Sequence, residues 1–259
     1  MYQPVIQTSQ IGYHPPQDKE AVIEMDIRDN RKETAQIIRI DADGEKVVKN
    51  VTPANWGKIL RYNYLKVNFT DVKEPGLYKI KYNTSVSPIF RIDNDVYARG
   101  VWQPVLEYFL PVQMCHMRVN EKYRVWHDCC HMDDAQMAPA HNHIDGYDQK
   151  EGLSKFKPGE VVPGVNIGGW HDAGDFDLRI ESQAGESYIL ALAYEAFHPN
   201  LDVTSIDQIN RVTEIHQPDG KNDLLQQVEN GALTVVNGYL ALGRLYRGII
   251  CNDLRQYVL

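Results

Sequence analysis

The chain has 259 residues, of which 43% are hydrophobic, 24% charged and 10% aromatic. This composition excludes a disordered or collagen-like chain and is typical of a globular protein. The net charge of −8 includes no cluster of Lys and Arg, which argues against nucleic acid or an anionic membrane as partner. No apolar run approaches the roughly 20 residues that span a bilayer, so we expect no membrane insertion. No signal peptide is visible at the N-terminus.

The first 94 residues predict a small β-sandwich. Short alternating runs, separated by turn signals at Asp43-Gly44 and Pro75-Gly76, are typical of antiparallel strands at this spacing. The predicted strands cover residues 21–25, 35–40, 64–69, 77–82 and 88–92.

After residue 95 the apolar spacing becomes helical. The pattern predicts a first helix up to about residue 110, an irregular stretch over about 116–170, and two long helices over 178–197 and 222–247. His198-Pro199 ends the first of the long helices, and Asn222 is a plausible N-cap for the second. Tyr188, Leu192 and Phe197 fall near one helix face, which we interpret as a packing face. The chain is thus predicted to be an all-β module followed by the start of an all-α one.

The segment Gly168-Gly169-Trp170-His171-Asp172-Ala173-Gly174-Asp175 is the densest group of chemically active residues. Asp172 and Asp175 are three residues apart with a glycine between them, so both carboxylates can converge on one point. Such a pair could hold a water molecule or a metal. Alternatively, Asp175 could simply cap the helix that follows.

A second group combines cysteines and histidines. Three of the four cysteines, Cys115, Cys129 and Cys130, lie within sixteen residues of one another, with several histidines nearby, which indicates a metal site before a disulfide scaffold. Zinc prefers four tetrahedral Cys and His ligands, but this spacing matches no compact zinc finger. Buried free cysteines and surface histidines are the alternative. Asp133 and Asp134 could orient a ligand histidine, act as caps, or lie in solvent.

Several segments in the same order along the chain resemble glycoside hydrolase family 9, the inverting β-glucanases. Residues 168–175 resemble the family's glycine-aromatic-aspartate signature, and Cys130-His131-Met132-Asp133-Asp134-Ala135 resembles its cysteine-histidine-x-aspartate-aspartate segment. Further similarities lie at Gln10-Ile11-Gly12-Tyr13-His14-Pro15, Phe69-Thr70-Asp71-Val72, Pro75-Gly76-Leu77-Tyr78, Ser87-Pro88-Ile89-Phe90-Arg91-Ile92 and Lys221-Asn222-Asp223-Leu224-Leu225.

The resemblance implies a fold and a reaction. Residues 1–94 would be the immunoglobulin-like module, and residues 95–259 the incomplete first part of an (α/α)₆ barrel. The enzyme would be an endo-β-1,4-glucanase-like glycosidase acting on cellulose, xyloglucan or mixed-linkage glucan. Asp175 would be the general base, Asp172 would help to position the attacking water, and Trp170 is a candidate for stacking on a sugar or for a packing anchor. The acid, a downstream glutamate, is missing from this chain, so we expect the chain alone to be inactive.

The resemblance also implies a structural zinc held by Cys115, Cys130, His131 and His171. Cys129, His141 and His143 are competitors for these places. A calcium ion is a further expectation for which the sequence identifies no ligands. The resemblance also implies that the protein is secreted or periplasmic and that its partner is a β-glucan polysaccharide or oligosaccharide. A zinc-dependent hydrolase of another class and a non-catalytic carbohydrate-binding module are the alternatives.

Overall fold

A computed structural model describes residues 2–139, 141–142, 148–149, 154–172 and 176–249. The chain divides into two compact units, Met1–Trp102 and Gln103–Leu259, and each is described by itself. The change of sequence character near residue 95 therefore lies a few residues before the division between the units.

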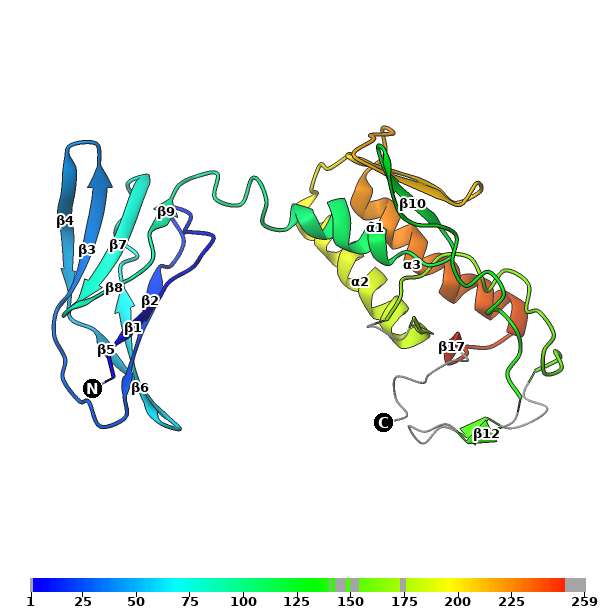
Figure 1. Cartoon of the computed structure of the whole chain (residues 1–259), viewed down its shortest axis with the longest axis horizontal. Helices are drawn as coiled ribbons and strands as arrows, with labels where there is room; N and C mark the ends of the chain where they lie inside the picture. Colours follow the sequence, from blue (N-terminus) through cyan, green and yellow to red (C-terminus); the bar gives the residue numbers. More distant parts are fainter. Residues whose placement is uncertain (1, 140, 143–147, 150–153, 173–175, 250–259) are drawn as a thin grey trace. The chain divides into compact units, whose positions relative to one another are not determined.

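The first unit consists of two antiparallel sheets (Figure 1). One sheet has the strand order β1-β2-β6-β5, and the other has the order β4-β3-β7-β8, with β9 beside the far end of β7. The strands are β1 (Val5–Gln7), β2 (Glu20–Asp26), β3 (Ala35–Asp41), β4 (Gly44–Val51), β5 (Ala54–Ile59), β6 (Tyr62–Asn68), β7 (Gly76–Tyr82), β8 (Ser85–Val86) and β9 (Phe90–Ile92).

Alternating side chains form the core of this unit. In β2 and β6 every second residue is buried, and Ile23 and Leu65 pair directly across the two strands with no exposed surface. Burying a side chain of this size contributes about 1.5–3 kcal/mol. Phe69 completes the core with edge-to-face contacts to Tyr13, at 5.1 Å between ring centroids.

Four strands of the first unit were not predicted from the sequence: the short strands β1 and β8, and the longer strands β4 and β5. Most residues of β4 and β5 are exposed, so their sequences lack the apolar alternation that identifies a half-buried strand. Each strand lies at one edge of its sheet, where backbone pairing with a single neighbour is sufficient to form it.

The second unit is built around two long helices, α2 (Ile180–Phe197) and α3 (Asp223–Leu242), which pack side by side (Figure 1). The predicted cap of α3 is confirmed, because the side chain of Asn222 accepts hydrogen bonds from the amides of Leu224 and Leu225. Gly243 ends the helix in a left-handed conformation. None of the helices in the described part of the chain has the length and apolarity needed to cross a bilayer.

The helix expected before residue 110 is short and irregular. A π-helical turn, η1 (Val105–Phe109), leads into α1 (Leu110–Gln113), a single α-helical turn with Pro111 near its start. The lack of a backbone N–H at Pro111 is compatible only with the beginning of a regular helix.

A four-stranded sheet with the order β11-β10-β16-β15 was not predicted: two of its strands lie in the region expected to be irregular, and the other two lie between the long helices. Its strands are β10 (Arg118–Glu121), β11 (Arg124–His127), β15 (Thr204–Asp207) and β16 (Val212–Ile215). β10 and β16 run parallel although more than 90 residues separate them. Further two-residue strands are β12 (His141–Asn142), β13 (Asp148–Gln149), β14 (Leu178–Arg179) and β17 (Gly248–Ile249).

The packing face predicted for α2 is wrong for the described part of the chain. Tyr188 and Phe197 are 63% and 80% exposed, and Leu192 is also exposed. The buried residues of this helix are Ile180, Gln183 and Ser187. The inward face of helix α2 is mixed: Gln183 and Ser187 make hydrogen bonds there, and Leu190, Ala193 and Tyr194 pack against the apolar core.

Candidate functional site

The cysteine-histidine group lies where three segments meet. Cys115 follows α1, Cys130 and His131 follow β11, and His171 lies in the glycine-tryptophan segment that leads to α2. Backbone hydrogen bonds join two of these segments: the Cys115 amide donates to the Gly169 carbonyl at 3.0 Å, and the His171 amide donates to the Gln113 carbonyl at 2.8 Å. This pairing brings Cys115 and His171 together.

The ligand atoms of Cys115, Cys130, His131 and His171 all lie within 4.8 Å of one another. The two sulfurs are 3.8 Å apart, Cys115 Sγ is 3.6 Å from His131 Nδ1, and Cys130 Sγ is 3.4 Å from His171 Nε2. Tetrahedral zinc, with bonds of about 2.3 Å to sulfur and about 2.0–2.1 Å to nitrogen, would separate two sulfurs by about 3.8 Å and sulfur from nitrogen by about 3.5–3.6 Å. The four side chains therefore have the chemistry and the spacing of a tetrahedral metal site.

The electrostatics of the group favour one thiolate. The hydrogen bond from the Cys115 thiol, together with those from His127, His171 and His131, lowers the pKa of Cys130 well below its usual range. The hydrogen bond to Cys130, together with burial, raises the pKa of Cys115. The hydrogen bond to Cys130 also raises the pKa of His127, the imidazole beside the four-residue group. A thiolate is the form of cysteine that binds a metal.

The competing ligands have different positions. Cys129 is exposed, and its sulfur lies 3.8 Å from the Arg211 carbonyl instead of in the group. His141 lies in β12, and His143 lies outside the described residues.

No separate role was predicted for His116 from the sequence. It is completely buried beside Cys115, with Nε2 3.2 Å from Asp134 Oδ1 and Nδ1 3.3 Å from the Gly168 carbonyl. Asp134 thus orients a histidine next to the metal-type ligands, and His116 connects Cys115 to the glycine pair. The position next to Cys115 is the only sequence signal that could have identified it.

The structure describes the two ends of the segment that runs from Asp172 to Asp177, which we call the aspartate segment. The Asp172 amide donates to the Asp177 carbonyl at 2.8 Å, so the two ends meet. Arg179 links their side chains, with Nη2 3.2 Å from the buried Asp177 carboxylate and Nε 3.7 Å from that of Asp172. Asp175, the expected base, lies outside the described residues. The N-cap position of α2 is Arg179, and the alternative that Asp175 caps this helix stays a prediction.

Trp170 lies in the core of the second unit. It is 1% exposed, and its indole N–H donates to Gln227 Oε1 at 2.8 Å. Gly168 precedes it in a left-handed conformation, where a Cβ atom would lie 2.3 Å from the Asn230 carbonyl oxygen. Of the two roles weighed for Trp170, the geometry favours the packing anchor, since its ring offers no free face to a sugar.

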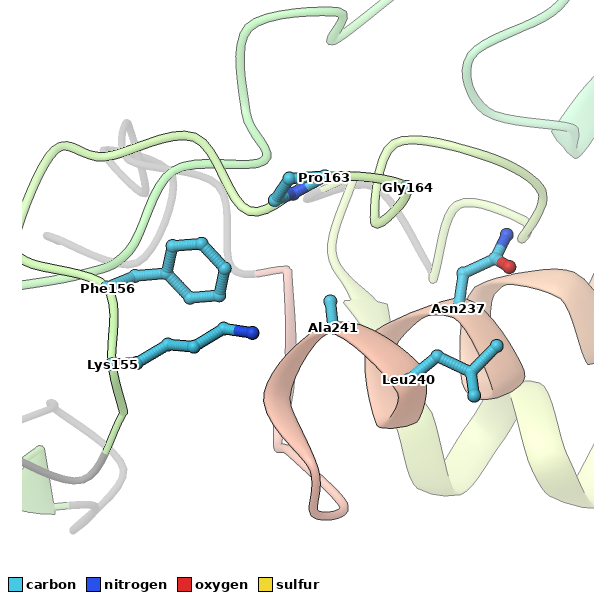
Figure 2. Close-up of a pocket in the computed structure, with 7 residues that line it drawn as sticks. All are labelled: Lys155, Phe156, Pro163, Gly164, Asn237, Leu240 and Ala241. Atoms are coloured by element: carbon cyan, nitrogen blue, oxygen red, sulfur yellow. The ribbon is translucent and has the colours of Figure 1, made fainter.

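A separate cavity of about 330 Å³ lies between the segment around Phe156 and the last turns of α3 (Figure 2). Its lining residues are Lys155, Phe156, Pro163, Gly164, Asn237, Leu240 and Ala241. Among the described residues, this lining contains no carboxylate, histidine or cysteine, so it lacks the paired carboxylates that glycoside hydrolysis requires.

Comparisons with known proteins agree with this description. Residues 1–87 match the family model of the cellulase N-terminal ig-like domain. A search of curated protein sequences gives no match.

Three solved structures share the fold. A metagenome-derived glycoside hydrolase family 9 endoglucanase has a TM-score of 0.66 at 23% identity, over 95% of this chain and 42% of its own. A Bacteroides ovatus GH9 protein gives 0.63 at 20% identity, over 94% and 41%. A Zn-binding triple mutant of the GH family 9 endoglucanase J30 gives 0.60 at 22% identity, over 86% and 38%.

The chain thus spans about two fifths of the length of the solved structures that it matches. Residues 1–87 match the cellulase N-terminal ig-like domain, and the chain shares the fold of the family 9 glycoside hydrolase endoglucanases that it matches.

Proposed function

We propose that this chain is the amino-terminal part of an inverting glycoside hydrolase that cleaves β-1,4-glucosidic bonds in β-glucans. The proposal rests on one observation: the group of four potential metal ligands is directly connected in the chain to the aspartate segment. His171 belongs to the group of four ligands, and the next residue, Asp172, begins the segment whose end meets Asp177. A metal bound there would hold this segment in place.

Zinc is the proposed occupant, and its role is structural. Two cysteines and two histidines complete a tetrahedral shell and leave no position for water or substrate. The distances between the ligand atoms support this choice. When bound, zinc supplies a cross-link between the segments that carry Cys115, Cys130 and His171.

The chemistry is assigned to the carboxylates. Asp175 acts as the general base that removes a proton from the attacking water, and Asp172 helps to hold that water. In an inverting glycosidase, the acid that protonates the leaving oxygen lies about 6.5–9.5 Å from the base, across the sugar. A glutamate in a further part of the protein supplies this acid, so this chain holds only the base side of the site.

The helices support the barrel assignment. α2 and α3 pack as a pair, and both expose large apolar side chains, including Ile189 and Leu240 at 62% and 71% exposure. Neighbouring helices of an (α/α)₆ barrel would cover these side chains. A β-glucan polymer as substrate implies secretion or export to the periplasm.

The first test measures hydrolysis by the longer gene product. Asp175→Ala should abolish the release of reducing ends from soluble β-glucan, while Asp133→Asn, a change at an exposed aspartate, should leave it near the wild-type rate. Retained activity in Asp175→Ala, with its folding intact, would remove Asp175 as the base.

Chelation separates this proposal from a zinc-dependent hydrolase. For a structural zinc, the unfolding temperature falls when metal is removed, and folded enzyme that has lost its zinc still turns over substrate. For a catalytic zinc, turnover falls in proportion to the metal removed, even while the protein is folded.

A further inference from the structure

Four aromatic side chains form a row across one sheet of the first unit. Trp56 on β5 contacts Tyr64 on β6 at 5.6 Å between ring centroids, Tyr64 lies 6.0 Å from Tyr62, and Tyr62 lies 5.8 Å from Tyr2, just before β1. The row crosses the sheet β1-β2-β6-β5 from one edge strand to the other.

The row lies on the outer face of the sheet. On β6 the residues that alternate with the tyrosines, Asn63 and Leu65, are buried, so the pleat turns Tyr62 and Tyr64 away from the core. Trp56 sits at a register shift between Asn55 and Gly57, where the extra residue re-aims the side chain. It is 53% exposed, and Tyr2 is 39% exposed.

A carboxylate fixes the centre of the row. Glu24 on β2 accepts hydrogen bonds from the hydroxyls of Tyr2 and Tyr64 and from the amide of Gln7, at 3.5 Å. These bonds hold the tyrosines at set positions before any ligand arrives, which lowers the entropy lost on binding. The amide and hydroxyls also place polar atoms directly beside the exposed rings.

This combination suits a sugar chain. Pyranose rings have C–H faces, which stack on the electron-rich faces of aromatic rings, and hydroxyl edges, which need hydrogen-bond partners. A row of rings fits an extended polymer better than it fits a single small molecule. Two opposite charges lie at the row, since Arg61 sits over the Tyr62 ring at 5.4 Å and Glu24 lies at the centre, whereas a nucleic acid would need an excess of positive charge.

We propose that the row of Trp56, Tyr64, Tyr62 and Tyr2 is a binding platform for a β-glucan chain, separate from the aspartate segment. The choice of a β-glucan rests on the proposed function, while the platform itself rests on the geometry of the first unit. It would hold the polymer without taking part in the cleavage.

The test is affinity electrophoresis of the 259-residue chain in native gels that contain soluble mixed-linkage β-glucan. The wild type should be retarded, and Trp56→Ala should raise the dissociation constant about tenfold or more, the loss of about 1.4 kcal/mol. Trp56→Tyr should keep most of the binding. Tyr123→Ala removes a fully exposed aromatic side chain from the turn between β10 and β11 of the second unit, and should bind like the wild type.

Tyr2→Ala is a second variant, outside any strand, whose effect does not depend on the edge strand β5. It should weaken binding as well. Wild-type protein that runs unretarded would overturn the proposal, as would unchanged retardation of both Trp56→Ala and Tyr2→Ala. Self-association that is lost in Trp56→Ala, without any effect of glucan, would assign the face to a second copy instead.

The two proposals fail separately. If the wild type binds glucan through Trp56 but the longer gene product hydrolyses none, the platform stands and the proposed hydrolase fails. If hydrolysis depends on Asp175 but Trp56→Ala binds glucan normally, the platform fails alone.

Discussion

The two units of this chain differ in how much polar surface they bury beside their apolar cores. In the first unit, β2 and β6 turn their apolar residues inward, where Ile23, Leu65 and Phe69 have no exposed surface. In the second unit, α2 and α3 bury polar residues, including Gln183 and Asn230, beside an apolar core, and leave Phe197 and other large apolar side chains exposed.

The difference shows which interactions hold each unit together. The sandwich is stabilised mainly by apolar burial, which is non-directional and tolerates substitution of similar volume. The second unit depends more on directional contacts: the indole hydrogen bond of Trp170, the hydrogen bonds of Asn222 and the group of four metal-type ligands. We therefore expect the second unit to be more sensitive to changes at single polar positions.

The largest effect is expected from loss of a metal ligand. Cys130→Ser should remove zinc from the protein and lower the unfolding temperature of the second unit by roughly 10 °C or more, because metal binding contributes directly to folding free energy. The unfolding of the first unit should not change. Metal analysis and calorimetry measure the two effects.

The adjacent cysteine provides the matched control. Cys129→Ser changes an exposed thiol outside the four-residue group, and both zinc content and unfolding should remain as in the wild type. Equal zinc content in the two variants would contradict the assignment of Cys130 as a ligand.

A smaller effect is expected from a substitution at Gly231, the glycine of α3 that contacts Trp170. At Gly231 in α3, a Cβ atom would lie 2.4 Å from the Trp170 ring and 2.2 Å from Ser187 Oγ. Gly231→Ala should therefore lower the free energy of unfolding of the second unit by about 1–3 kcal/mol, as measured by denaturant titration.

Gly185 in α2 has nothing within 4 Å of its Cβ position. The same substitution there, Gly185→Ala, should be neutral or stabilise the unit by up to about 1 kcal/mol, because alanine favours the helix. If both variants were equally stable, Trp170 would not be tightly packed against α3.

The smallest effect concerns pH. Burial raises the pKa of Asp223, in the first turn of α3, to about 6 from 3.8. The folded form therefore holds this proton more tightly than the unfolded form, so the stability that this group contributes is largest below about pH 4 and falls as the pH rises to about 6. We expect a decrease of about 1–2 kcal/mol, since the helix N-terminus favours the charge and partly offsets burial.

Thermal unfolding of the second unit between pH 4 and 7 measures this slope, by comparison with Asp223→Asn. The variant cannot lose a proton at this position, so its slope should be flatter than that of the wild type. Parallel slopes would show that the carboxyl of Asp223 titrates normally.

The sequence predicted those elements whose signal is local. The alternation of Ala21 to Met25 indicated a strand, and Asn222 indicated the start of α3, because both patterns arise within one element. β10 and β16 were not predicted, since each has four residues and their pairing joins distant parts of the chain.

The ligands of the candidate site could not all be predicted from the pattern of residues along the chain. Spacing alone could not separate Cys130 from Cys129, because only the path of the chain turns one sulfur toward Cys115 and the other toward Arg211. The role of His116 was missed for the same reason. Its partners, Asp134 and the Gly168 carbonyl, are 18 and 52 residues away.

The group of four metal-type ligands also has an evolutionary consequence. With zinc bound, Cys130 and His171 fix the two ends of the intervening segment, 41 positions apart in the sequence. The entropy of closing such a loop grows slowly with its length, so that doubling the length costs only about 0.6 kcal/mol. Insertions and deletions within this segment could therefore accumulate in related proteins while the position of Asp172 stays unchanged.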